Sequence, residues 1–321
     1  MAAQPKRFDY GRKAGLVERL RLDAEAHRCD KPATYEYEKT LLSLGNPRAV
    51  VDDAAAYFQA CDDWFRVRQL SHDAHLQLRD YAGAAEDATR LITAEPHEWR
   101  HYQARATDYR HLGRRELVAA DLRQAMVLQP SVRAITEELA YTAEKLAQPC
   151  DAIVPLEAQV YYDHYVARPR LAAQLASCPQ KAGTGSARII DRDDPHVLDG
   201  RVLVGGVRAR FSVAADSAYV VITRALAQRL HLDLSAAPSL LVDVSDDHFL
   251  PARLVRLPSL QLDDARAEEI EAAVVDALPG GLDGRLGISF FGRFETSLSS
   301  TTGGDVGDVD GDDGALVLRA P

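Results

Sequence analysis

The residue that could do chemistry most directly is Asp216, in the stretch RFSVAADSAYVVIT, residues 210–223. The pattern predicts a strand that runs into a tight turn and out again. A carboxylate in such a turn could hold and deprotonate a water molecule, as a general base does. A turn aspartate can also cap its own backbone, and we favour this structural role for Asp216.

A second chemical pattern is HEWRH, which runs from His97 to His101 and matches the zinc motif H-E-x-x-H. In a zinc peptidase the two histidines stand on one face of a continuous helix, and the glutamate activates water. Here Pro96 predicts a turn at His97, and Thr107 stands where one version of the motif needs a third histidine. A zinc site whose third ligand is a distant acidic residue is still an alternative. We expect instead that His97 and His101 lie at the start of a surface helix and bind no metal.

Two weaker patterns could also bind a metal. SHDAH carries His72 and His75, and TTGGDVGDVDGDDGA near the C-terminus carries alternating aspartates, as a calcium loop does. These aspartates are Asp308, Asp310 and Asp312. The glycine comes one place late, at Gly314, and Arg319 stands where a bidentate glutamate would lie. We expect a solvated hairpin loop over 305–313, with calcium binding as the alternative, and no metal or cofactor elsewhere.

The elements that position these residues fall into two regions. From 31 to 178 the chain is rich in Ala, Leu, Arg and Glu and predicts one helix after another. Two segments, YAGAAEDATRLITAEP ending at Pro96 and RELVAADLRQAMVLQP ending at Pro130, repeat with a period of 34 residues. GNPRAVVDDAAAYFQAC fits a fainter copy, and QPCDAIVPLEAQVYY fits the second helix of a final one. The period resembles the tetratricopeptide repeat, which implies a curved surface that binds a peptide or protein.

The second region is predicted to be mostly β. Residues 1–30 form a lead-in to the helices, and 179–197 is a polar linker. Residues 198–321 then consist of short apolar runs between turn signals, with TRALAQRLHL as the one predicted helix. The predicted fold class is therefore α plus β in two domains, with a small closed barrel as the second.

Two segments of this region together resemble bacterial retropepsin-like aspartic proteases. FSVAADSAYVVIT lies where that family has a strand and an Asp-Thr-Gly turn. GGLDGRLGISFFGRFE resembles the family's second signature, apart from Arg285 at a usually apolar place. The resemblance implies a closed barrel and a homodimer, in which each half supplies one of two carboxylates that share a proton.

The turn departs from the family at its catalytic residue. Both flanks align without a gap and put Ala214 in the aspartate slot, Ala215 in the threonine slot and Asp216 in the glycine slot. Alanine cannot activate water, so we expect no catalytic residue here. A shifted triplet, Asp216-Ser217-Ala218, is the alternative, but it needs two extra residues before the turn and two fewer after it. The hairpin VDVSDDHFLPARL, at the position of the family's flap, has a charged tip without glycine and supports a degenerate protease.

Charge and cysteines limit the partners and the compartment. A net charge of −10 argues against nucleic acid, and no run of 18 apolar residues predicts a membrane span. The four cysteines form no C-x-x-C pair, and their spacing fits two helical hairpins clipped by Cys29–Cys61 and Cys150–Cys178 disulfides. Disulfides predict an oxidising compartment, periplasmic or secreted after removal of a signal peptide. Four free thiols in a cytoplasmic protein are the alternative.

We therefore expect a protein that binds a protein or peptide through its helical repeats and the cleft of a degenerate protease-like domain. An active aspartic endopeptidase that uses Asp216 is the second hypothesis. A zinc-dependent hydrolase that uses His97 and His101 is the third.

Overall fold

The computed structural model places the chain in two compact units, Met1–Arg114 and Arg115–Pro321. The described residues are 10–27, 29–162, 164–178, 182–190, 197–214, 216–244, 248–299 and 315–320.

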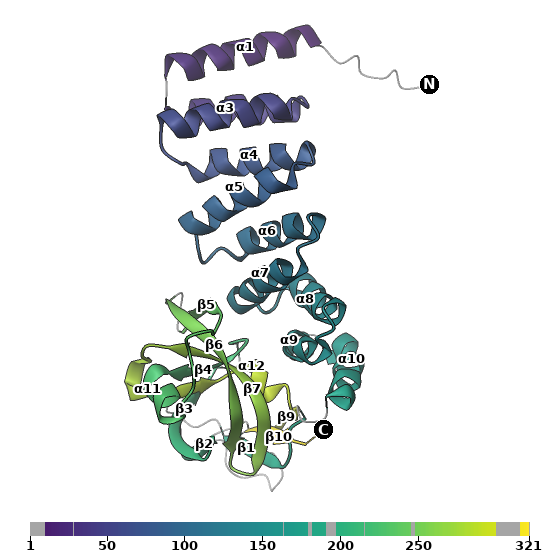
Figure 1. The fold of residues 1–321 in the computed structure, drawn as a ribbon, viewed down its shortest axis with the longest axis vertical. Helices are drawn as coiled ribbons and strands as arrows, with labels where there is room; N and C mark the ends of the chain where they lie inside the picture. Colours follow the sequence, from purple (N-terminus) through teal and green to yellow (C-terminus); the bar gives the residue numbers. More distant parts are fainter. Residues whose placement is uncertain are drawn as a thin grey trace, which may run out of the picture. The chain divides into compact units, whose positions relative to one another are not determined.

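Within its described residues, the first unit is a stack of helices, drawn from purple to blue in Figure 1. The bounds are α1 Tyr10–Ala26, α2 Lys31–Ser43, α3 Pro47–Ala60, α4 Phe65–Gln77, α5 Tyr81–Ala94 and α6 Trp99–His111. Helices α3 and α5 begin 34 residues apart, and so do α4 and α6. The predicted period of the helical repeat is therefore confirmed, and a helix, α1, lies in the predicted lead-in.

The same columns of the repeat are buried in each copy, because small or apolar side chains let neighbouring helices pack closely. One column consists of Val50, Ala84, Val118 and Ala152, none of them more than 2% exposed. Turn chemistry fixes the ends of the helices: Asp80 caps α5 by accepting a hydrogen bond from the Gly83 amide at 3.1 Å. A Cβ atom at Gly83 would lie 2.4 Å from the ring of His75, so this position requires glycine.

The second unit begins with two further helical pairs. These are α7 Arg115–Leu128, α8 Arg133–Lys145, the short η1 Pro149–Ala152 with α9 Ile153–Tyr162, and α10 His164–Ser177. Helix α7 begins at Arg115 and η1 at Pro149, again 34 residues apart, so the segment QPCDAIVPLEAQVYY holds the same place in its repeat as α7. Helices α5 and α7 end before Pro96 and Pro130, which mark the end of a repeat, so η1 with α9 is the second helix of a final repeat, as the sequence predicts.

Both predicted disulfides are present. Cys29 and Cys61 are bonded with 5.5 Å between their Cα atoms, and Cys150 and Cys178 with 5.9 Å. No described cysteine is free. Among the described helices, none combines the length and apolar character that a membrane crossing requires.

The rest of the second unit is rich in β-structure, drawn in green and yellow in Figure 1. Its elements are β1 Ser186–Ile190, β2 Val197–Val204, β3 Val207–Val213, β4 Val220–Thr223, α11 Arg224–Arg229, β5 Ser239–Asp243, β6 Phe249–Leu262, β7 Ala265–Val275, η3 Pro279–Gly281, β8 Gly284–Leu286, α12 Ile288–Phe291, β9 Glu295–Ser299 and β10 Ala315–Arg319. The predicted two-region α plus β fold class is confirmed.

The main sheet has the strand order β2-β3-β8-β4-β7-β6-β5, with an additional pairing of β2 with β6. A smaller sheet has the order β1-β10-β9. The main sheet is ring-like but not the closed barrel that we predicted. The reason lies in β6, because two strands pair with the edge that faces away from β7. Strand β5 pairs with the first half of β6, and β2 pairs with Leu260–Leu262 at its end.

The interior of this ring is apolar, as alternation along its strands requires. Its fully buried side chains include Val202, Phe211, Ile222, Leu257 and Phe290. The core holds β3, β4 and β8 in place, and these three strands carry the turn around Asp216.

Candidate functional site

The turn after β3 is anchored by backbone hydrogen bonds. The Ala214 amide donates to the Leu286 carbonyl at 2.8 Å, and the Ser217 amide donates to the Ala214 carbonyl at 3.0 Å. Ala214 is 3% exposed, whereas Asp216 is exposed. Ala215 lies outside the described residues. The β3 strand therefore delivers Ala214 to a buried position and turns Asp216 outward.

The second signature segment packs directly against this turn. Strand β8 pairs in parallel with β3, and the Ile288 amide at the start of α12 donates to the Ser217 carbonyl at 2.8 Å. A Cβ atom at Gly287 would lie 2.2 Å from the Tyr219 carbonyl oxygen, so glycine is required for this approach. The Ser289 hydroxyl joins the strands by accepting from the Val220 amide and donating to the Glu271 carbonyl. The two segments predicted to act together are brought together by the fold.

Asp216 lines a cavity of about 440 Å³. The β-side of the cavity is lined by Ser217, Val242, Asp243 and Arg285 together with Asp216, and the opposite side by residues 127–131 between α7 and α8. Arg285, the residue at an unusual place in the second signature, donates a hydrogen bond to the Val244 carbonyl. The cavity thus combines two carboxylates and one guanidinium, and a turn of the chain's own helices forms one wall.

Helix α7 is also tied to the hairpin that lies at the flap position. The Gln124 side chain donates to the Leu241 carbonyl at 2.9 Å and accepts from the Leu241 amide at 2.8 Å. The side-chain amide of Gln124 therefore forms the two hydrogen bonds with β5, the outer strand of the main sheet, that a neighbouring strand would form. Residues 245–247 at the hairpin tip, which include Asp246 and Asp247, lie outside the described residues, and His248 is exposed.

A charged network lies beneath the turn. Burial and the negative charge of Glu271 raise the pKa of the Tyr219 hydroxyl, although the contact with Arg123 of α7 opposes this. Arg256 of β6 lies 2.7 Å from Asp151 of η1 and 3.7 Å from Glu271 of β7. The Arg256 side chain is 49% exposed, so these contacts join η1 to β6 and β7 but are partly screened by solvent.

A second ion pair joins the same two parts. Arg293 Nε, just after α12, lies 2.5 Å from Glu157 Oε1 of α9, and both side chains are 0% exposed. Two buried charges are stable only as partners, so α9 and α12 depend on each other.

Comparison with known proteins locates the family resemblance in this region. Residues 200–290 match the family described as aspartyl protease. The C-terminal region is an aspartyl-protease-like domain. A search of curated proteins gave no match.

Solved structures of two kinds are similar to less than half of the chain each. A retropepsin-like aspartic protease from Rickettsia conorii shares 21% identity over 44% of this chain and 94% of its own, with a TM-score of 0.29. The crystal structure of MamA shares 11% identity over 49% of this chain and 92% of its own, with a TM-score of 0.42. MamA from Desulfovibrio magneticus RS-1 shares 15% identity over 49% of this chain and 88% of its own, with a TM-score of 0.41.

Several histidines outside the aspartyl-protease-like domain lie in ion pairs with carboxylates. His97 lies in a turn before α6, and His101 lies within α6 with Nε2 at 2.9 Å from Glu95. The continuous helix that H-E-x-x-H needs is therefore interrupted at His97, and Glu98 caps the helix instead. In the described parts of the chain, no group of three or more His, Cys, Asp or Glu side chains could hold a metal.

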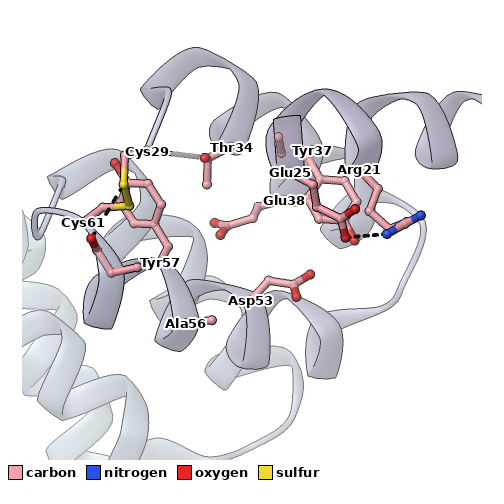
Figure 2. Close-up of a pocket in the computed structure, with 12 residues that line it drawn as sticks. Arg21, Glu25, Cys29, Thr34, Tyr37, Glu38, Asp53, Ala56, Tyr57 and Cys61 are labelled. Atoms are coloured by element: carbon pink, nitrogen blue, oxygen red, sulfur yellow. Dashed lines mark hydrogen bonds and ion pairs between the residues drawn. A yellow bond between two sulfur atoms is a disulfide. The ribbon is translucent and has the colours of Figure 1, made fainter. Parts of the chain in front are cut away.

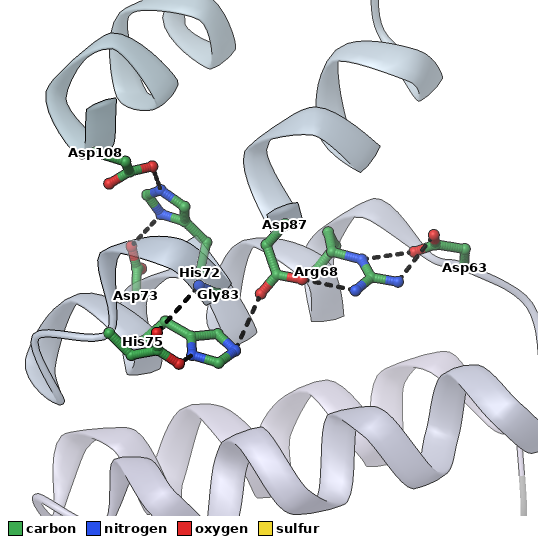
Figure 3. A network of polar contacts seen from close by, with 9 residues as sticks. Asp63, Arg68, His72, Asp73, His75, Gly83, Asp87 and Asp108 are labelled. Carbon is green, nitrogen blue, oxygen red and sulfur yellow. Dashed lines mark hydrogen bonds and ion pairs between the residues drawn. The ribbon is translucent and has the colours of Figure 1, made fainter. Parts of the chain in front are cut away.

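The pair His72 and His75 lies on α4 in the network of Figure 3. His72 contacts Asp108 at 3.2 Å, and His75 contacts Asp80 at 2.8 Å. The two histidines contact different carboxylates, so they do not form a common metal site. The acidic loop with Asp308, Asp310, Asp312 and Gly314 lies outside the described residues, and Arg319 is in β10.

Sequence reasoning missed the residues that join the helices to the aspartyl-protease-like domain. No sequence motif contains Gln124, Arg123 or Glu157. Glu157 carried one usable signal, because it is the single charged residue in the otherwise uncharged helix IVPLEAQVYY. A lone charge among buried apolar residues indicates a buried partner.

Proposed function

We propose that this protein binds a protein or peptide through its helical repeats, and that its aspartyl-protease-like domain has no protease activity. The observation that carries the proposal is Ala214, the residue just after β3, where our register of the two flanking strands puts the catalytic aspartate of the family. Its methyl group can neither hold a water molecule nor take its proton.

The surroundings of the turn support the same proposal. A retropepsin-like site needs a second protomer to approach the turn and a flap that is free to open. Here residues 127–131 line the cavity next to Asp216, and Gln124 holds β5 at the flap position. The chain's own helices occupy space that a second protomer or an extended substrate would need, so we propose that the domain does not pair through this turn.

The proposed compartment is the periplasm or the exterior of the cell. The two disulfides support it, because structural disulfides persist in oxidising surroundings. The partner would then be a protein of the same compartment.

One observation favours the alternative of an active endopeptidase. Asp216 and Asp243 line one cavity, and aspartic peptidases use two carboxylates. The assay below separates the two functions.

The test is hydrolysis of unfolded casein and of a fluorogenic peptide library from about pH 3 to about pH 7 by the full chain. We expect no cleavage above that of the Asp216→Asn variant. Asp264→Asn, in the exposed β6–β7 turn, is the matched control. Cleavage by the wild type and by Asp264→Asn that Asp216→Asn abolishes would establish the protease and refute our proposal.

A restored site gives a sharper result. The triple change Ala214→Asp, Ala215→Thr and Asp216→Gly rebuilds the family's turn, and we expect no activity while the protein stays monomeric, since one chain supplies one carboxylate. Sedimentation is measured alongside activity. A triple variant that dimerises through the turn and stays inactive would show that our register of the turn is wrong.

A further inference from the structure

The first unit contains a cavity that the proposed function does not use. It lies between α1, α2 and α3, has a volume of about 440 Å³, and is bounded at one end by the Cys29–Cys61 disulfide (Figure 2). Its polar lining comes from Arg21 and Glu25 of α1, Tyr37 and Glu38 of α2, and Asp53 and Tyr57 of α3. Three helices thus bring three carboxylates to one open cavity.

Glu38 is the residue that requires explanation. Its side chain is 0% exposed, and neither carboxylate oxygen has a hydrogen-bond partner. In Figure 2 the carboxylate of Glu38 reaches from α2 into the space above Asp53 and Tyr57. Burying a carboxylate without a hydrogen-bond donor is unfavourable, so a missing partner is indicated.

The cavity's own cation does not serve this purpose. Arg21 is the one cationic residue among those that line the cavity, and its guanidinium is bound to Glu18 at 2.7 Å and to Glu25, both on its own helix. The Tyr57 hydroxyl donates to Asp62 at 3.2 Å. Arg21 and Tyr57 therefore direct their donors to carboxylates other than Glu38.

We propose that this cavity binds an alkylammonium group, with the ammonium between the carboxylates of Glu38 and Asp53 and the alkyl chain along the rings of Tyr37 and Tyr57. An ammonium is a compact cation with three donors, which suits carboxylates that approach from different helices. Tyrosine faces attract such a cation and cover its methylene groups. The source is either a lysine side chain of a protein partner or a free diamine.

The cavity belongs wholly to the first unit, so the inference does not rest on the proposed function of the aspartyl-protease-like domain. Loss of ammonium binding with partner capture intact would refute this inference alone. Protease activity with intact ammonium binding would refute the proposed function alone.

The test is calorimetric titration of the full chain with 1,5-diaminopentane and with the peptide acetyl-Gly-Lys-Gly-amide. Acetyl-Gly-norleucyl-Gly-amide, which lacks the ammonium, is the ligand control. We expect at least one ammonium ligand to bind and the norleucine peptide not to bind. Binding of the lysine peptide identifies a protein segment as the source, and binding of the diamine alone identifies a free amine.

The matched variants lie on the same helix. Glu38→Gln keeps the shape of the side chain and removes its charge, so we expect affinity to fall about tenfold or more. Glu36→Gln changes an exposed carboxylate on α2 and should leave affinity unchanged. Failure of both ammonium ligands to bind the wild type, or equal affinity of Glu38→Gln and the wild type, would overturn the inference.

The dependence on pH gives a second readout in the wild type. Burial, and then the charge of Asp53, raise the pKa of Glu38 to about 8, and burial also raises the pKa of Asp53. The other titratable groups facing the cavity are Arg21 and Glu25 from α1, and Tyr37 and Tyr57.

Below about pH 8 an arriving cation must displace the proton of Glu38, whereas the ligand itself stays charged up to about pH 10. Affinity should therefore rise about 20-fold between pH 6.5 and pH 8.5 in the wild type and change little in Glu38→Gln. A flat profile in the wild type would contradict the assignment of Glu38 as the ligand.

Discussion

His72 shows how a single buried residue can set the response of this protein to pH. Its side chain lies on α4 against Asp108 of α6, which is 0% exposed (Figure 3). Burial alone would lower the pKa of His72, but the contacts with Asp108 and Asp73 outweigh it and raise the pKa to about 9. The folded state therefore holds a proton that the unfolded chain releases near pH 6.5.

A histidine with a raised pKa stabilises the fold fully below its unfolded pKa, and this stabilisation is lost as pH rises through the folded pKa. We expect the wild type to lose on the order of 3 kcal/mol relative to His72→Gln between pH 6.5 and pH 9. Thermal unfolding followed by tryptophan fluorescence measures it, because both tryptophans, Trp64 and Trp99, lie in the first unit. His27→Gln, at an exposed histidine, is the control. If the stability of the wild type and of His72→Gln changes with pH in the same way, His72 is not protonated against Asp108 in the folded state.

At the scale of elements, each disulfide ties together parts of one unit. Cys29 precedes α2 and Cys61 follows α3, so the bond spans 32 residues and closes the end of the ammonium cavity. Cys150 in η1 and Cys178 after α10 are 28 residues apart. Loops of such similar length restrict the unfolded chain by similar amounts.

Replacing both cysteines of one pair by serine should therefore lower the stability of the unit that holds it by about 3–4 kcal/mol. The Cys29→Ser, Cys61→Ser protein should lose stability in the tryptophan-monitored transition. The Cys150→Ser, Cys178→Ser protein should lose it in the part of the circular dichroism transition that tryptophan does not report. If either change shifts only the transition of the other unit, the placement of that disulfide in its unit is incorrect.

At the scale of the whole molecule, the boundary between the compact units falls inside the helical repeats, at Arg114 and Arg115. The helices α7 to α10 have the 34-residue spacing of the array, yet they share a unit with the β-structure. Gln124, the Arg256 network and the Glu157–Arg293 pair account for this, since each joins a helix to the sheet or to α12. The last repeats thus act as a structural part of the aspartyl-protease-like region.

Breaking the buried pair tests this arrangement. Glu157→Gln leaves Arg293 buried beside a neutral partner and should destabilise the second unit by about 3–5 kcal/mol. Glu144→Gln, at an exposed carboxylate of α8, is the matched control and should cost about 1 kcal/mol or less. We expect the tryptophan-monitored transition of the first unit to stay where it is in both variants. An equal shift of both transitions would show that the two units unfold as one.

The sequence by itself determined the features that depend on local pattern. A 34-residue period, small residues in fixed columns, prolines at turns and alternating apolar runs are readable along the chain, so the helical array and the β region followed from them. The disulfides also followed, because their spacing matches one helical hairpin each. The pattern failed at the closure of the barrel, because β5 and β2 both pair with the same edge of β6.

Only the tertiary structure decided which distant side chains meet. Gln124 and Leu241 are 117 residues apart, and nothing in the periodicity of either segment specifies a hydrogen bond between them. The orphaned Glu38 likewise looks like an ordinary helical glutamate until α1 and α3 enclose it. Periodicity fixes which face of an element is buried, whereas the partner of a buried polar group depends on how separate elements pack in three dimensions.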